Sequence, residues 1–150
     1  MRAEGVAVGL GTDGPAGSNN DLDIMEEMDL AAKLAKISKM NPLALNAQSV
    51  VAMATIDGAR ALHMEKDIGS LESGKKADLV LLSLNTPNSV PVYDVYAQIA
   101  YASKASDIDS VIIGGRLVME HRKVLTVDEQ AAIRKAREYK KSIAASLGMQ

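Results

Sequence analysis

The chain has 150 residues, 47% hydrophobic and 24% charged, a composition that suits a globular protein with one ordinary core. The formal charge of -2 comes from interspersed acidic and basic residues, so no basic stripe is present to neutralise a phosphate backbone, and nucleic-acid binding is not expected. Cysteine is absent, which excludes disulfides and thiolate metal sites and leaves histidine and carboxylate side chains as candidate metal ligands.

Neither a membrane span nor a leader sequence is expected. No apolar run approaches the roughly 20 residues that cross a bilayer. The segment Met1-Arg2-Ala3-Glu4 lacks the basic and then apolar profile of a signal peptide. A cytoplasmic location is therefore the default expectation.

The first predicted unit is a strand, a loop and a helix. Residues 5–11 are apolar or very small without polar alternation, which is typical of a parallel strand covered on both faces. After a polar loop, Asn19 or Asn20 is a candidate N-cap for a helix. The apolar positions of that helix recur at helical spacing and are Ile24, Met28, Ala31 and Ala35. Asn41-Pro42 ends it.

A second helical stretch is predicted from about Asn46 to about Leu62, bent or restarted at Thr55, before a turn at Gly69. Alternation of a strand with helices indicates the α/β class. Beyond Gly69, residues 77–84 predict a buried strand.

The last part of the chain predicts a hairpin and a helix. Residues 111–113 and 117–119 flank Gly114-Gly115, which suits a β-hairpin turn. Residues 93–102 are left unassigned. Thr126 and Glu129 have the capping-box spacing. The helix that follows carries an apolar stripe of Ala132, Ala136, Tyr139, Ile143 and Leu147.

Asp13 is the candidate catalytic residue. It follows the predicted buried strand directly, among glycines that allow other groups to approach, which is where α/β barrels place catalytic side chains. The alternative is that Asp13 only forms an Asx-turn with the loop amides. The local motif does not decide between the two.

Three ordered motifs resemble the last barrel strand and the following segments of the amidohydrolase superfamily, above all its methylthioadenosine/S-adenosylhomocysteine deaminases and triazine chlorohydrolases. The first motif is Gly11-Thr12-Asp13-Gly14 with Ser18-Asn19-Asn20-Asp21-Leu22-Asp23 and Glu26-Glu27-Met28; the others are 54–62 and 68–80. Gly17 is an insertion relative to the commoner loop, which bears on its substrate contacts.

The resemblance implies that this chain is the C-terminal portion of a longer enzyme. Residues 1–66 would end a TIM-like metal-dependent hydrolase barrel. Residues 67–125 would form part of a composite β-sandwich that the enzyme's N-terminus completes, and residues 126–150 a C-terminal amphipathic helix. The partners implied are the remainder of the same enzyme upstream, a small-molecule substrate and further copies in a homo-oligomer.

The resemblance also implies that Asp13 is both a metal ligand and an acid-base group. The family uses one divalent metal, zinc or iron, to activate water. Its remaining ligands, a His-X-His pair and further histidines, and its glutamate acid would lie outside this chain. His63 and His121 lack ligand-like spacing, so both are interpreted as structural or exposed.

The function implied is hydrolysis of a C-N bond in a cyclic amidine, foremost deamination of S-adenosylhomocysteine or methylthioadenosine. A triazine chlorohydrolase or another cyclic-amidine deaminase is the nearest alternative. A non-catalytic scaffold that keeps this segment for its fold is the alternative from a different class.

Overall fold

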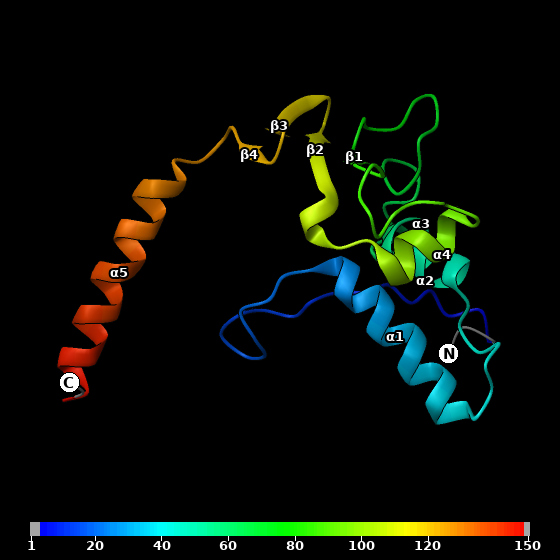
Figure 1. Ribbon diagram of the computed structural model, residues 1–150, viewed down its shortest axis with the longest axis horizontal. Coiled ribbons are helices and arrows are strands. Elements are labelled where there is room, and N and C mark those ends of the chain that lie inside the picture. The colour runs from blue at the N-terminus through cyan, green and yellow to red at the C-terminus, as the bar shows by residue number, and fades with distance from the viewer. Residues whose placement is uncertain (1–3, 149–150) are drawn as a thin grey trace.

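The structure is a computed structural model that describes residues 4–148 (Figure 1). The first three residues of the predicted segment 1–66 and the last two of 126–150 lie outside this range. In chain order the elements are α1 (Ile24–Lys39), α2 (Ala47–Ala54), α3 (Ile56–Ala61), β1 (Leu79–Leu82), α4 (Val95–Ala97), the π-helical turn η2 (Gln98–Ala102), the 3-10 turn η3 (Ala105–Asp107), β2 (Ile108–Ile113), β3 (Arg116–Glu120), β4 (Lys123–Val124) and α5 (Glu129–Ser146).

The core lies where α1, α2 and η2 meet. Its buried side chains are Met25, Met28, Ala32, Val50 and Ala100. Methionine and alanine fill this space without aromatic rings, because flexible thioethers adapt to irregular gaps between helices. The Lys36 ammonium group ties the same elements together, since it donates to the Leu45 carbonyl at 3.1 Å and to the Tyr101 hydroxyl at 3.0 Å.

Both predicted helical regions are confirmed, but the expected cap of the first is wrong. Asp23, rather than Asn19 or Asn20, caps α1, and its side chain accepts from the Met25 amide at 2.8 Å. Asp23 stands directly before the first helical residue, so only its carboxylate can reach the free amides of the first turn. The predicted interruption at Thr55 separates α2 from α3.

The predicted strand over residues 5–11 does not form. Among the described residues, this segment makes one backbone hydrogen bond outside its own turn, from the Leu10 amide to the Met53 carbonyl at 3.2 Å. A parallel strand needs neighbouring strands whose amides and carbonyls pair with it. The described residues next to this segment belong to the helices α2 and α3. The segment therefore has the apolar pattern of a strand but lacks the hydrogen bonds to a neighbouring strand.

Two glycines bring this segment onto α3. A Cβ atom added at Gly9 would stand 2.9 Å from the Gly58 Cα atom, which is closer than non-bonded carbon atoms approach. The two backbones therefore touch without side chains between them. This contact and the Leu10–Met53 hydrogen bond fix the chain just before Asp13.

The strands form one antiparallel sheet in the order β1-β2-β3-β4. The predicted hairpin is confirmed, with Gly114 and Gly115 at positive φ between β2 and β3. The Asp78 carboxylate accepts from the Gly114 amide at 2.5 Å and so connects the start of β1 to the hairpin turn.

The prediction that β1 is buried is wrong. Val80 and Leu81 point to opposite faces of the sheet, as successive strand residues do, and are 53% and 50% exposed. Both faces of the sheet are therefore open at β1. The apolar sequence of β1 is typical of a buried strand, but no described residue packs over Val80 and Leu81 closely enough to bury them.

α5 forms in the predicted range, and its cap differs from the predicted capping box. Asp128 caps it by accepting from the Ala131 amide at 2.9 Å, so Thr126 is not the capping residue. Figure 1 shows α5 extending from β4, away from the helices of the core. None of its described side chains is buried.

The chain exposes far more surface than a compact protein of its size. Its solvent-accessible surface is 10806 Å², whereas a compact monomer of the same mass, 15.9 kDa, exposes about 7,400 Å². Large apolar side chains on α1, the sheet and α5 contribute to this excess. No helix within residues 4–148 is long and apolar enough to cross a membrane.

Gly9→Ala is expected to destabilise the protein by about 1–3 kcal/mol, because the new methyl group overlaps the Gly58 backbone and forces a shift. Gly11→Ala is the matched control, since a Cβ atom there meets nothing within 4 Å. It should change stability by less than about 0.5 kcal/mol. Chemical denaturation measures both, and equal stabilities would contradict the packing of this segment on α3.

Candidate functional site

Asp13 lies in the exposed loop between the segment 5–11 and α1. Its φ of 57° is in the left-handed region, which aspartate tolerates better than most side chains. One carboxylate oxygen, Oδ1, accepts from the Gly14 amide at 2.7 Å. The other oxygen, Oδ2, accepts no hydrogen bond from any described residue. Asp13 therefore makes the local turn contact and still presents a free carboxylate oxygen.

The loop after Asp13 folds on itself. The Gly14 carbonyl accepts from the Gly17 and Ser18 amides at 3.2 and 3.0 Å. Asn19 accepts from the Asp21 amide at 2.7 Å and donates to the Ser18 hydroxyl at 3.1 Å. The side chains of Ser18 and Asn19 thus maintain the shape of the loop that holds Asp13.

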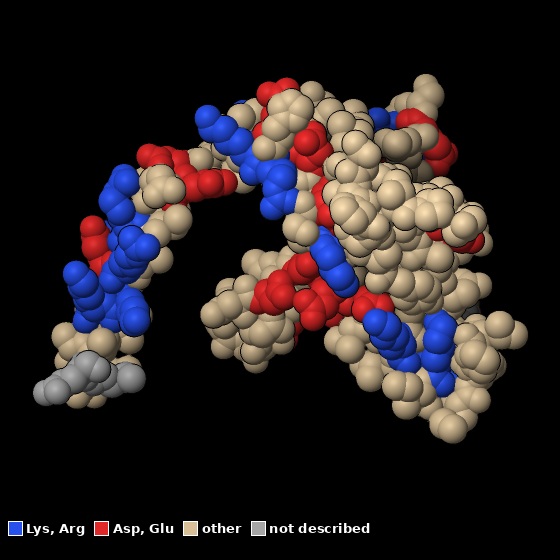
Figure 2. All heavy atoms as spheres, viewed as in Figure 1, with Lys and Arg blue, Asp and Glu red and all other residues tan. Residues whose placement is uncertain are grey.

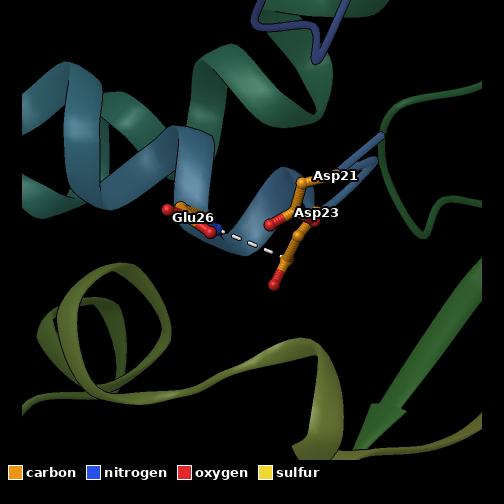
Figure 3. A group of neighbouring side chains, drawn as sticks. All are labelled: Asp21, Asp23 and Glu26. Carbon is orange, nitrogen blue, oxygen red and sulfur yellow. Dashed lines mark hydrogen bonds between the residues drawn. The ribbon is translucent and has the colours of Figure 1, made fainter. Parts of the chain in front are cut away.

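A group of three carboxylates that sequence reasoning did not single out stands at the start of α1 (Figure 3). Asp21, Asp23 and Glu26 each offer an oxygen atom within 4.8 Å of the others. Their spacing, with Asp23 three residues before Glu26, is that of a helix cap, and this signal could have located the true cap. Asp23 accepts from two backbone amides of α1 in this role.

The electrostatics of this group come from like charges. The hydrogen bond to Asp21, followed by the charge of Asp21, raises the pKa of Glu26 above its ordinary value, and the charge of Lys104 opposes the shift. Glu26 is exposed, so water screens much of this repulsion. The group contains no histidine, and its central carboxylate is committed to the helix, so we interpret it as a cap.

Both histidines lie on turns with left-handed backbone conformations, His63 after α3 and His121 between β3 and β4. The His121 Nδ1 atom lies 3.2 Å from a carboxylate oxygen of Asp109, whose hydrogen bond and charge raise the pKa of His121. Within residues 4–148, neither histidine joins Asp13 in a group of possible metal ligands. The interpretation of both as structural or exposed agrees with this placement.

The described residues alone do not fit a catalytic zinc site. Such a site takes about three protein ligands and keeps one position open. Asp13 supplies one carboxylate, and the three-carboxylate group at α1 is the only possible ligand group within residues 4–148. Asp13 is not a member of that group.

The comparisons with known proteins decide the family. The Amidohydrolase family model matches residues 1–118. The chain belongs to the amidohydrolase family. The resemblance carried by the loop around Asp13 and by the two following motifs is therefore confirmed.

Several curated relatives carry the name of one enzyme. A 5-methylthioadenosine/S-adenosylhomocysteine deaminase of Syntrophus aciditrophicus is 44% identical over 98% of this chain and 33% of its own length. One from Carboxydothermus hydrogenoformans is 49% identical over 87% of this chain and 30% of its length. The chain thus spans about a third of the length of the relatives it matches.

Solved structures share the fold. An adenosine deaminase from Xanthomonas campestris with bound zinc matches 96% of this chain and 33% of its own with a TM-score of 0.92 and 37% identity. A triazine hydrolase variant matches 91% of this chain and 30% of its own with a TM-score of 0.82 and 25% identity. The helices and sheet described above therefore recur within longer chains.

The isolated 150-residue chain is expected to bind zinc no more tightly than about millimolar and to have no deaminase activity, because one carboxylate cannot replace three or four ligands. Isothermal titration calorimetry with zinc chloride measures the affinity. Asp13→Ala is the control variant and should leave the weak binding unchanged within error. A tight stoichiometric site in the isolated chain would contradict the assignment of the missing ligands to other parts of the enzyme.

Proposed function

We propose that the complete enzyme deaminates the adenine ring of S-adenosylhomocysteine or methylthioadenosine, and that this chain is its C-terminal part. The observation that carries the proposal is the match of nearly the whole chain, at 44% identity, to a relative named for this activity. In such a reaction water adds to the ring carbon that bears the amino group, and ammonia leaves. The product is the corresponding inosyl compound.

Asp13 is the residue of this chain that we assign to the chemistry. A non-glycine residue with positive φ is uncommon and is often found where a side chain must be aimed at a ligand. Its Oδ1 atom is held by the Gly14 amide, so Oδ2 can take a proton from the attacking water and return it to the leaving amine. The same carboxylate is the proposed metal ligand.

The metal itself must be bound mainly outside this chain. Members of the fold have been solved with zinc, which supports one divalent metal, with zinc the first candidate and iron the second. We propose that the histidine ligands and the glutamate acid belong to the upstream part of the enzyme. A cytoplasmic location and assembly as a homo-oligomer remain part of the same proposal.

In the complete enzyme we assign three roles along the chain. Residues 1–66 end the TIM-like barrel, residues 67–125 contribute part of the composite β-sandwich, and residues 126–150 form the C-terminal helix. The open sheet supports this assignment, because β1 has the apolar pattern of a covered strand and is half exposed on both faces. The unpaired segment 5–11 supports it too, since a barrel would supply its neighbours.

A triazine chlorohydrolase is the competing function. It is favoured by the triazine hydrolase variant with a TM-score of 0.82, but that protein is only 25% identical to this chain. The curated relatives named as deaminases reach 49% identity. Deamination is therefore the better supported of the two reactions.

Asp13→Asn in the complete enzyme should lower kcat by at least about 100-fold, because the amide can still accept from Gly14 but cannot take up a proton. The melting temperature should be nearly unchanged. Asp57→Asn and Asp78→Asn are the controls. Asp57 pairs with Arg60 at 2.6 Å and Asp78 holds the Gly114 amide, so each should keep kcat within a few-fold. Equal losses in all three variants would place the chemistry on a different residue.

The complete metal-loaded enzyme should convert S-adenosylhomocysteine or methylthioadenosine to the inosyl product faster than it dechlorinates a chlorotriazine. Ammonia release and the change in purine absorbance measure deamination, and chloride release measures the competing reaction. Release of chloride with no reaction of either adenosyl compound would replace the deaminase assignment by the chlorohydrolase.

A further inference from the structure

α5 has an apolar face that no described residue buries, although the Lys135 ammonium group of the same helix lies 5.1 Å from the centre of the Tyr139 ring. Tyr139, Ile143 and Leu147 recur at helical spacing and are 59%, 58% and 66% exposed. Ala132 and Ala136 continue the same stripe toward the start of the helix. Burial of this stripe would remove apolar surface from water, and a helix that keeps such a face normally packs it.

The opposite face of α5 is polar and mainly basic. Figure 2 shows basic side chains along the length of the helix. Five basic residues and two acidic ones lie within Glu129–Ser146. Lys135 and Glu138 form an ion pair at 3.0 Å, and both side chains are exposed to solvent. One face is thus suited to water and the other to a protein surface.

Within residues 4–148, no packing contact explains the place that α5 occupies. It is joined to the sheet through the two-residue strand β4, and none of its described side chains is buried. In proteins, most of the stability of a helix comes from tertiary packing of its amphipathic face rather than from helix propensity. A further contact must therefore hold α5.

The comparisons indicate which part of the protein makes that contact. The match with the Syntrophus aciditrophicus relative covers 98% of this chain, so it takes in α5 as part of a protein about three times as long. The solved Xanthomonas campestris chain superposes on 96% of this chain with a TM-score of 0.92, which includes most of α5. That solved chain is about three times as long as this one, so about two thirds of it lies outside the matched part.

We propose that the apolar stripe of α5, residues Ala132, Ala136, Tyr139, Ile143 and Leu147, packs on the part of the same enzyme that lies outside this chain. The proposal rests on the longer enzyme of the proposed function, but not on its substrate. A contact within one polypeptide is favoured over a contact between copies. A stable interface between copies uses about 20–30 residues from each side, and the stripe offers five.

The test compares two adjacent substitutions in the complete enzyme. Ile143→Asp places a charge on the stripe, and Ser142→Asp places the same charge one residue earlier on the polar face. For Ile143→Asp, hydrogen exchange of the α5 amides should become at least about tenfold faster. The melting temperature should fall by at least about 3 °C. Ser142→Asp should match the unsubstituted enzyme in both measurements, and light scattering should give the same oligomeric state for all three proteins.

Two results would overturn the proposal. Unchanged hydrogen exchange in Ile143→Asp would mean that the stripe is not packed. Dissociation of an oligomer by Ile143→Asp, with a melting temperature that depends on protein concentration, would mean that the stripe lies between copies. If Ile143→Asp does not yield folded protein, Ile143→Ala and Ser142→Ala give the same comparison with smaller changes. Deaminase activity is assayed in parallel, so its absence from the unsubstituted enzyme counts against the proposed function alone.

Discussion

The position of Asp13 depends on how the backbone just before it is held. Segment 5–11 makes one backbone hydrogen bond to another element among the described residues, from the Leu10 amide to the Met53 carbonyl. The close approach of Gly9 to Gly58 adds a contact that no larger residue would allow. These two contacts link the Asp13 loop to α2 and α3, and α2 packs on α1. The helices therefore hold the segment that precedes Asp13, and no neighbouring strand among the described residues takes part.

The open surfaces of the chain have a common physical origin. The large accessible area, the half-exposed β1 and the uncovered face of α5 all place apolar side chains in water, where each costs free energy relative to burial. β1 and α5 have the apolar patterns of buried elements, yet both are exposed. We infer that residues outside the described part of the protein cover them. The relatives, three times as long, have the length to supply them.

The local sequence pattern was sufficient to predict those helices and turns that depend on neighbouring residues alone. The spacing of Met28, Ala31 and Ala35 predicted α1, Thr55 predicted the break between α2 and α3, and Gly114-Gly115 predicted the hairpin. Helical periodicity and the glycine requirement of tight turns are properties of neighbouring residues, and no distant contact is needed to read them. The mixture of helices and strands fits the predicted α/β class, whereas the barrel and the sandwich stay predictions.

The predictions were wrong where the structure depends on a distant strand partner or on the exact residue at which a helix begins. The apolar run at residues 5–11 carries the pattern of a strand, yet a strand exists only when another strand pairs with it. Asn19, Asn20 and Asp23 are all good caps by residue type, and only the first helical residue, Ile24, selects Asp23. The role of Asp13 could not be derived from its own motif, because a metal site is assembled from distant parts of a chain, and we propose that this chain supplies one carboxylate to it.

The core also sets how strongly the Asp13 loop and the sheet are coupled. Ala100 of η2 is buried with Met25 and Val50, and Lys36 of α1 donates to the Tyr101 hydroxyl, so residues after Gly69 complete the core of the helices before it. If residues 1–66 end a barrel and 67–125 belong to a sandwich, the two are joined by packed side chains rather than by a linker. Interior side chains transmit displacement because they are close-packed. The covering of the sheet by the rest of the enzyme would then also restrict the helices that hold Gly9, Leu10 and, through them, Asp13.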